Sequence, residues 1–226
     1  MTTAESVLLV HGAWHGGWCY ADLQADLDRR GIRSRTVDLL SSGGPAGLAE
    51  DAALVRESLA ANPEPTLLVG HSYGGAVISE AAAGAGNVTG LVYLCAFLLP
   101  VDVALLDVVG GQLPPWIDVH EDTGTATVND PRFAFYLDCT EEQIAAASAR
   151  LKPQCLAAFT AKQTNAAWQH LPSTYVICEQ DNAIPAEAQE AMAAGAGTVV
   201  RMNASHSPFM SRPDEVAEIL AKAAAT

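Results

Sequence analysis

The sequence predicts an α/β protein with a doubly wound, mostly parallel sheet of six strands. Strand-length apolar runs alternate with segments of helical periodicity, which is typical of repeated βα units. Several runs are apolar throughout, as expected of strands that helices cover on both faces. About seventy residues separate the fourth run from the fifth, where roughly 2 to 6 usually suffice. We therefore expect an α/β core of residues 1–101 and 172–226, with a helical cap (lid) insertion of residues 102–171.

Each element has its own local signal. The strands are predicted at Val7–Val10, Ser34–Leu39, Thr66–Val69, Val88–Ala96, Thr174–Cys178 and Thr198–Met202. Helices are predicted between them at Trp18–Arg30, Leu48–Ala61, Ala76–Ala83 and Ala186–Ala194. The last helix is expected to begin in a capping box at Ser211–Asp214 and to run towards Ala225. In the cap, helices are expected over Thr140–Lys152, with Thr140 and Gln143 as a capping box, and over Gln154–Lys162. The plainer alternative for this insertion is a helical excursion that only covers the core.

Charge and cysteine content exclude several function classes. The formal net charge is −14 with no basic run, which disfavours nucleic acid and anionic membranes as partners. The N-terminus lacks the basic and apolar regions of a signal peptide, so we expect a cytoplasmic protein. The five cysteines are scattered without a C-x-x-C pair, so neither a disulfide framework nor a zinc site is expected. The expected partner is a small molecule, and a homodimer stays open.

The segment Gly70 to Gly75 carries the first chemical signal. It contains a G-x-S-x-G motif around Ser72, placed between an apolar strand and a helix-forming run. In this context the motif predicts a nucleophile on a strained turn, with its hydroxyl projecting above the sheet. Gly70 and Gly74 are expected where strand and helix pass too closely for a Cβ atom. The alternative is a structural glycine turn without chemistry.

A serine nucleophile needs a base and a group that orients the base. His206 follows the last predicted strand and Asp181 follows the one before it, so the chain order is Ser72, Asp181, His206. The other five histidines precede the nucleophile or lie in the insertion. For the carboxylate, Glu179 and Asp102 remain alternatives, because both also lie near strand ends.

The oxyanion of a tetrahedral intermediate needs backbone N–H donors. Tyr73, directly after the nucleophile, and Ala13, in the glycine-rich loop after the first strand, are the candidates. That loop lacks the glycine patterns of nucleotide sites, and no H-E-x-x-H metal motif occurs. Aromatic residues of the cap and the first loop are expected to form an apolar substrate pocket: Trp14, Trp116, Phe135 and Trp168.

These motifs resemble those of the plant methylesterase and hydroxynitrile lyase branch of the α/β-hydrolases and its bacterial esterase relatives. The resemblance covers nearly the whole chain and is most specific in five segments: residues 10–18, 70–75, 135–139, 181–185 and 205–210. It implies an α/β-hydrolase fold and a carboxylic ester hydrolase without a cofactor or metal, with Ser72, Asp181 and His206 as triad and Ala13 and Tyr73 as oxyanion donors. The chain departs from the lyases at Gly12 and Ser207, where they carry threonine and lysine. Its cap is also shorter than in the plant enzymes.

The leading function is therefore hydrolysis of a small, fairly apolar carboxylic ester through an acyl-enzyme. One alternative is a carbon-carbon lyase or cofactor-free oxygenase that uses the same serine and histidine as acid and base. Another is a non-enzymatic ligand receptor, because fold alone does not fix function.

Overall fold

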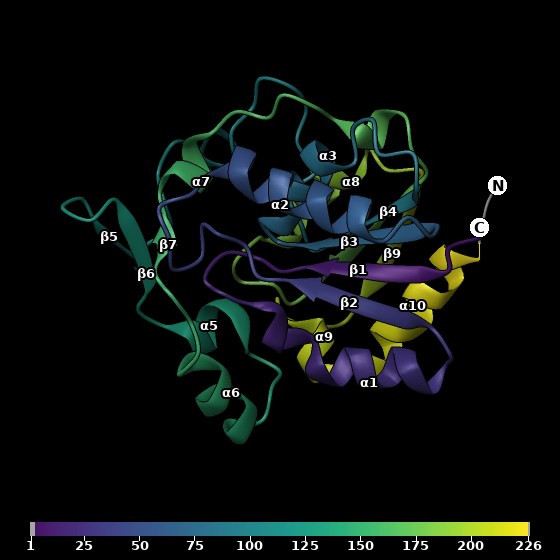
Figure 1. Ribbon diagram of the computed structural model, residues 1–226. Coiled ribbons are helices and arrows are strands. Elements are labelled where there is room, and N and C mark those ends of the chain that lie inside the picture. Colours follow the sequence, from purple (N-terminus) through teal and green to yellow (C-terminus); the bar gives the residue numbers. More distant parts are fainter. Residues whose placement is uncertain (1–2, 226) are drawn as a thin grey trace.

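A computed structural model describes residues 3–225 of the chain and contains a six-stranded parallel sheet in the order β2-β1-β3-β4-β8-β9 (Figure 1). The strands are β1 (Ser6–Val10), β2 (Arg33–Val37), β3 (Thr66–His71), β4 (Val88–Leu94), β8 (Ser173–Cys178) and β9 (Thr198–Met202). Every neighbouring pair is parallel, with β1 between β2 and β3. The predicted six-stranded doubly wound sheet is confirmed.

Helices cover both faces of this sheet, so the central strands β1, β3, β4 and β8 are buried along most of their length. On one side lie η1 (Gly17–Tyr20), α1 (Ala21–Arg29), α9 (Pro208–Ser211) and α10 (Pro213–Ala224). On the other side lie α2 (Leu48–Ala61), α3 (Gly74–Ala81) and α8 (Ala186–Ala193). Two separate apolar clusters result, one for each face. Within residues 3–225, no helix combines the length and apolar character needed to cross a bilayer.

Some predicted boundaries were wrong. The fourth strand ends at Leu94 rather than Ala96, because Cys95 turns the chain with a positive φ of 38°. The capping box at Ser211–Asp214 does not form. Ser211 instead ends α9, and its hydroxyl donates to the Asp138 carboxylate at 3.0 Å. The last helix therefore begins at Pro213, without a side-chain cap.

Residues 102–171, which we call the cap segment, hold both helices and a small sheet. The helical elements are α4 (Leu105–Val108), α5 (Pro131–Phe135), α6 (Glu141–Ser148), α7 (Ala157–Thr160) and η2 (Ala167–Gln169). The predicted capping box of Thr140 and Gln143 is present at the start of α6. Three antiparallel strands accompany them: β5 (Ile117–His120), β6 (Thr125–Val128) and β7 (Gln154–Cys155). The cap segment therefore contains a small sheet, which the sequence did not predict, beside its helices.

The helix expected over Gln154–Lys162 is the clearest error in this segment. Its first two residues pair with β6, and the Cys155 N–H donates to Ser41 O at 2.9 Å, so only Ala157–Thr160 is helical. The small sheet escaped prediction because β5 is largely exposed and its alternation of apolar and polar residues extends over only four residues, Ile117–His120, which is a weak strand signal. Figure 1 shows β5, β6, β7 and α5 at the carboxyl end of β1, where its loop emerges from the sheet.

Candidate active site

Ser72 occupies a sharp turn between β3 and α3. Its φ is +53°, a conformation that L-residues rarely adopt. A Cβ added to Gly74 would lie 2.5 Å from Val10 O, and one added to Gly70 would lie 2.5 Å from Gly74 O. Both neighbours are backbone atoms that side-chain motion cannot move aside. Glycine at 70 and 74 thus allows the strand, turn and helix to approach each other and present Ser72 at the end of the sheet.

His206 and Asp181 form a buried hydrogen-bonded pair. The His206 Nδ1–H donates to Asp181 Oδ2 at 2.6 Å, which leaves Nε2 as the ring nitrogen available to accept a proton. The other carboxylate oxygen, Oδ1, accepts from the N–H groups of Ala183 at 2.7 Å and Ile184 at 2.9 Å. Gln189 Nε2 donates to Oδ2 at 3.0 Å. The carboxylate is therefore fixed from both sides, and the imidazole tautomer with it.

The two alternative carboxylates lie elsewhere. Asp102 is exposed beyond the end of β4 and contacts Gln163 only through its backbone N–H. Glu179 is exposed and pairs with Arg201 at 3.7 Å. Among the described residues, Asp181 is thus the acid that contacts His206.

His71 supports the main chain of His206, a contact that the sequence did not predict. The buried His71 Nε2–H donates to His206 O at 2.7 Å, and the rings of the two histidines lie 4.6 Å apart. Burial holds the pKa of His71 well below its usual value, so the ring is neutral. In the sequence, only the position of His71 directly before Ser72 could have indicated that it lies near the site.

Two backbone N–H groups are free to bind an anion near Ser72. Among residues 3–225, neither the Ala13 N–H nor the Tyr73 N–H donates a hydrogen bond to another group. Both residues line the cavity that Ser72 and His206 also line. Orphan donors at the edge of an apolar cavity are the arrangement expected of an oxyanion hole.

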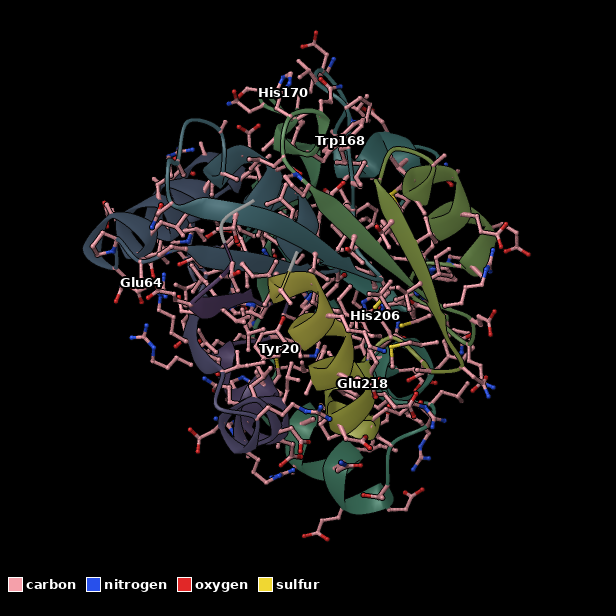
Figure 2. All side chains as sticks on the ribbon, turned by 90° about the vertical axis from the view of Figure 1, so that its right-hand side faces the viewer. Tyr20, Glu64, Trp168, His170, His206 and Glu218 are labelled. Atoms are coloured by element: carbon pink, nitrogen blue, oxygen red, sulfur yellow. The ribbon has the colours of Figure 1, made fainter. Side chains whose placement is uncertain are left out.

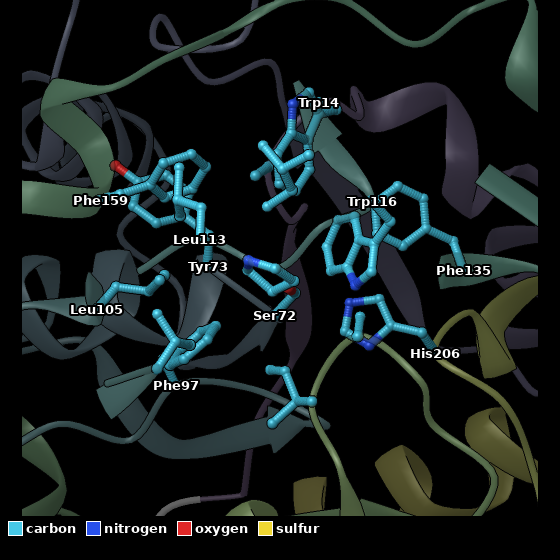
Figure 3. A pocket seen from close by; sticks show the side chains of 16 residues that line it. Trp14, Ser72, Tyr73, Phe97, Leu105, Leu113, Trp116, Phe135, Phe159 and His206 are labelled. Atoms are coloured by element: carbon cyan, nitrogen blue, oxygen red, sulfur yellow. The ribbon is translucent and has the colours of Figure 1, made fainter. Parts of the chain in front are cut away.

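The cavity at Ser72 is mainly apolar and nearly filled (Figure 3). Its volume is about 40 Å³, on the order of the space for one water, so a substrate must displace lining side chains. Of the predicted pocket residues, Trp14, Trp116 and Phe135 line it. Phe159, another aromatic residue of the cap segment, lines it as well. The lining residues that the prediction missed are Phe97, Leu105, Val109, Leu113, Pro114, Ile117, Ala183 and Ile184. Several of these residues lie in loops after strand ends or in short elements of the cap segment. The sequence does not indicate how close such residues lie to Ser72.

Trp168 does not line the cavity, contrary to expectation. Its indole N–H donates to Leu99 O at 3.0 Å, and its ring packs on Gly195, where an added Cβ would lie 2.8 Å from it. Figure 2 shows it near His170 and well apart from His206. The ring fills space between the core and the end of the cap segment.

Phe135 packs between the cavity tryptophans and His206. Its ring centroid lies 5.6 Å from that of His206, 5.7 Å from that of Trp14 and 5.5 Å from that of Trp116. On its other side His15 Nε2 accepts from the Tyr136 hydroxyl at 2.7 Å. These contacts are continuous from the cap segment to the first loop, and His206 is buried beneath them.

One buried group could offer three metal ligands within the described part of the chain: His71, Cys95 and His206, whose ligand atoms lie within 4.8 Å of one another. The ring N–H groups of both histidines already donate, to His206 O and to Asp181. The other ring nitrogens, His71 Nδ1 and His206 Nε2, make no hydrogen bond among the described residues, so a metal bound through them would occupy His206 Nε2, the nitrogen expected to act as the base.

Comparison with known proteins gives consistent findings. The family model described as "Alpha/beta hydrolase family" matches residues 7–219. An alpha/beta hydrolase from Aspergillus novofumigatus is 30% identical over 240 residues, covering 97% of this chain and 96% of the relative. The crystal structure of a pyrethroid hydrolase from Sphingobium faniae superposes with a TM-score of 0.87 at 26% identity, covering 98% of both chains. The methylesterase MES16 from Arabidopsis shares the fold, with a TM-score of 0.82 at 21% identity over 96% of this chain and 98% of its own.

Proposed function

The chain belongs to the alpha/beta hydrolase family and is an enzyme of its carboxylesterase type, and we propose that it cleaves a small, apolar carboxylic ester through an acyl-Ser72 intermediate. One observation carries this proposal. The His206–Asp181 pair fixes an imidazole whose Nε2 is free of other hydrogen bonds among the described residues, in the same cavity as Ser72 and two free N–H groups.

Each group then has one task. The Ser72 hydroxyl attacks the ester carbonyl carbon while its proton passes to His206 Nε2. The carbonyl oxygen becomes an oxyanion and accepts from the Ala13 and Tyr73 N–H groups. Collapse of the tetrahedral intermediate expels the alkoxide, which takes the proton from His206. Water repeats the sequence on the acyl-enzyme, releasing the acid and restoring Ser72. Asp181 keeps the Nδ1–H tautomer throughout.

The cavity wall indicates the substrate class. Its side chains are aromatic and aliphatic apart from Ser72 and His206, and no lysine or arginine is among them. A carboxylate or phosphate on the substrate would therefore lose its hydration without gaining a partner. Uncharged esters with apolar acyl and alcohol groups fit this wall, in keeping with the pyrethroid hydrolase among its relatives.

The test pairs product analysis with active-site labelling. Purified protein should release both acid and alcohol from uncharged p-nitrophenyl and aryl esters, and a fluorophosphonate should label Ser72 and stop turnover. Turnover without release of a carboxylic acid would favour the lyase or oxygenase alternative. Absence of both turnover and labelling would favour a receptor.

A further inference from the structure

A buried side chain from the cap segment contacts the loop that carries one oxyanion donor. Gln154, in β7, is fully buried, and its Oε1 accepts from the Trp14 N–H at 3.0 Å. Trp14 directly follows Ala13, whose N–H is free. Any shift of the Trp14 backbone therefore changes where the Ala13 N–H points.

The other end of the Gln154 amide leads to the second donor. Because the Trp14 N–H can only donate, Oε1 must face it, and Nε2 donates to Ser41 Oγ at 2.7 Å. The Ser41 hydroxyl in turn donates to Asp51 Oδ2 at 2.5 Å. The same oxygen accepts from the Tyr73 hydroxyl at 2.8 Å. One directed network thus joins the backbone of Trp14, the neighbour of Ala13, to the side chain of Tyr73.

Trp14 needs this support because its backbone is strained. Its φ is +63°, which is unfavourable for a large side chain and persists only where the surroundings hold it. Three hydrogen bonds hold Trp14, all from the cap segment. Besides that from Gln154, the indole N–H donates to Ala126 O at 2.9 Å, and the Lys152 N–H donates to Trp14 O at 2.9 Å. The cap segment therefore fixes the geometry of this loop.

We propose that Gln154 is a positioning residue of the oxyanion hole, linking the cap segment to both N–H donors through Ser41 and Asp51. The proposal rests on the proposed esterase function. The two N–H groups stabilise a charge that exists only in the tetrahedral intermediate, so misplacing them affects turnover more than substrate binding. A buried residue with only a structural role would lower stability without selectively lowering turnover.

The experiment compares two buried cap glutamines. Gln154→Met keeps the side-chain length but loses both hydrogen bonds. Gln163→Met is the matched control: Gln163 is buried, and its Nε2 donates to Ala76 O at 3.0 Å and to Asn165 O at 2.9 Å, without a hydrogen bond to Trp14, Ser41 or Asp51. Thermal unfolding of both variants reports their structural cost.

For Gln154→Met we expect kcat to fall about 10- to 100-fold, with KM changed less than about 3-fold. A trifluoromethyl ketone, whose adduct with Ser72 places an oxyanion in the hole, should bind more weakly by a factor similar to the loss in kcat/KM. Gln163→Met should lower the unfolding temperature comparably and leave kcat and inhibitor binding within about 3-fold of wild type.

The outcomes separate the two proposals. A wild-type protein that neither cleaves esters nor binds the ketone contradicts the esterase function itself. An active wild type whose Gln154→Met variant behaves like Gln163→Met overturns only the positioning role. If Gln154→Met does not fold, Tyr73→Phe removes the hydroxyl at the other end of the network. It should lower kcat and weaken the ketone several-fold at constant KM, and unchanged values would overturn the proposal.

Discussion

Replacement of Asp181 by asparagine tests the orientation of the base most directly. In the wild type, Asp181 Oδ1 accepts from the Ala183 and Ile184 N–H groups, at 2.7 and 2.9 Å. In Asp181→Asn the amide oxygen must keep this position, because an NH₂ group there would face two donors. The amide nitrogen then replaces Oδ2 and faces His206 Nδ1.

An NH₂ group at that position donates to Nδ1, so the ring proton moves to Nε2. The histidine then presents an N–H to Ser72 where a base is needed. A wrong tautomer of this kind costs about 10⁴-fold in kcat, which is about 5.5 kcal/mol of transition-state stabilisation. The new NH₂ also meets the Gln189 Nε2 donor, now 3.0 Å from Oδ2, so we expect reduced stability as well.

Asp102→Asn is the matched control. Asp102 is exposed and has a positive φ of 67°, a conformation that asparagine also tolerates. Initial rates with a p-nitrophenyl ester, normalised to folded protein by circular dichroism, should fall about 10⁴-fold for Asp181→Asn and less than about 2-fold for Asp102→Asn. Comparable rates for Asp181→Asn and wild type would refute the role given to Asp181.

Three further predictions concern the nucleophile, the cavity and the buried histidines. Ser72→Ala should lower kcat at least about 10⁴-fold, and Ser72→Gly should be equally inactive. In urea unfolding, Ser72→Gly should be more stable than Ser72→Ala by about 1 kcal/mol, because glycine accepts a φ of +53° without strain. Leu113→Ala should enlarge a cavity of about 40 Å³ and raise kcat/KM for a bulky aryl ester about 10-fold relative to kcat/KM for an acetate ester. An unchanged ratio would show that Leu113 does not limit the size of the substrate. Burial lowers the pKa of His11 to about 4 and that of His15 to about 3, below the unfolded value of about 6.5. The unfolded chain therefore takes up protons first as the pH falls, and the free energy of unfolding should drop by about 2 kcal/mol per histidine between pH 7.5 and pH 5; a flat profile would contradict their burial as neutral rings.

The central strands were predictable because two-sided burial leaves an apolar run in the sequence, and β1 and β3 are buried at every position. The edge strands β2 and β9 are mostly exposed or half-buried and carry a weaker signal. The small cap sheet left no such signal. Within β6, Ala126 is the single fully buried residue. The strand β7 has only two residues, and one of them is the polar Gln154. Its pairing depends on contacts distant in the sequence, which local propensity does not encode.

The candidate site divides in the same way. Ser72, Asp181 and His206 could be named because the motif and the strand ends fix their order, and the structure brings Asp181 and His206 into contact beside the Ser72 cavity. Their catalytic roles remain predictions. Trp168 could not be distinguished from Trp116 as a wall residue, since both are cap tryptophans and only packing separates them. The support from His71 and Gln154 was equally invisible, because both act on backbone groups.

These supporting contacts give the cap segment two physical tasks. Under the proposed function, Trp116 and Phe135 form the wall that would contact the substrate, while β6 and β7 supply the Ala126 carbonyl, which holds the Trp14 indole, and the Gln154 amide, which holds the Trp14 backbone. Trp14 belongs to both groups, since its ring lies in the wall and its backbone follows Ala13. A change that reshapes the wall near Trp14 therefore strains the oxyanion loop as well. Changes at Leu113 or Val109, which line the cavity without contacting this network through hydrogen bonds, leave that loop in place. We therefore expect substitutions on the α4 side of the cavity to change the substrate range without changing turnover. Substitutions on the β6–β7 side should change both together.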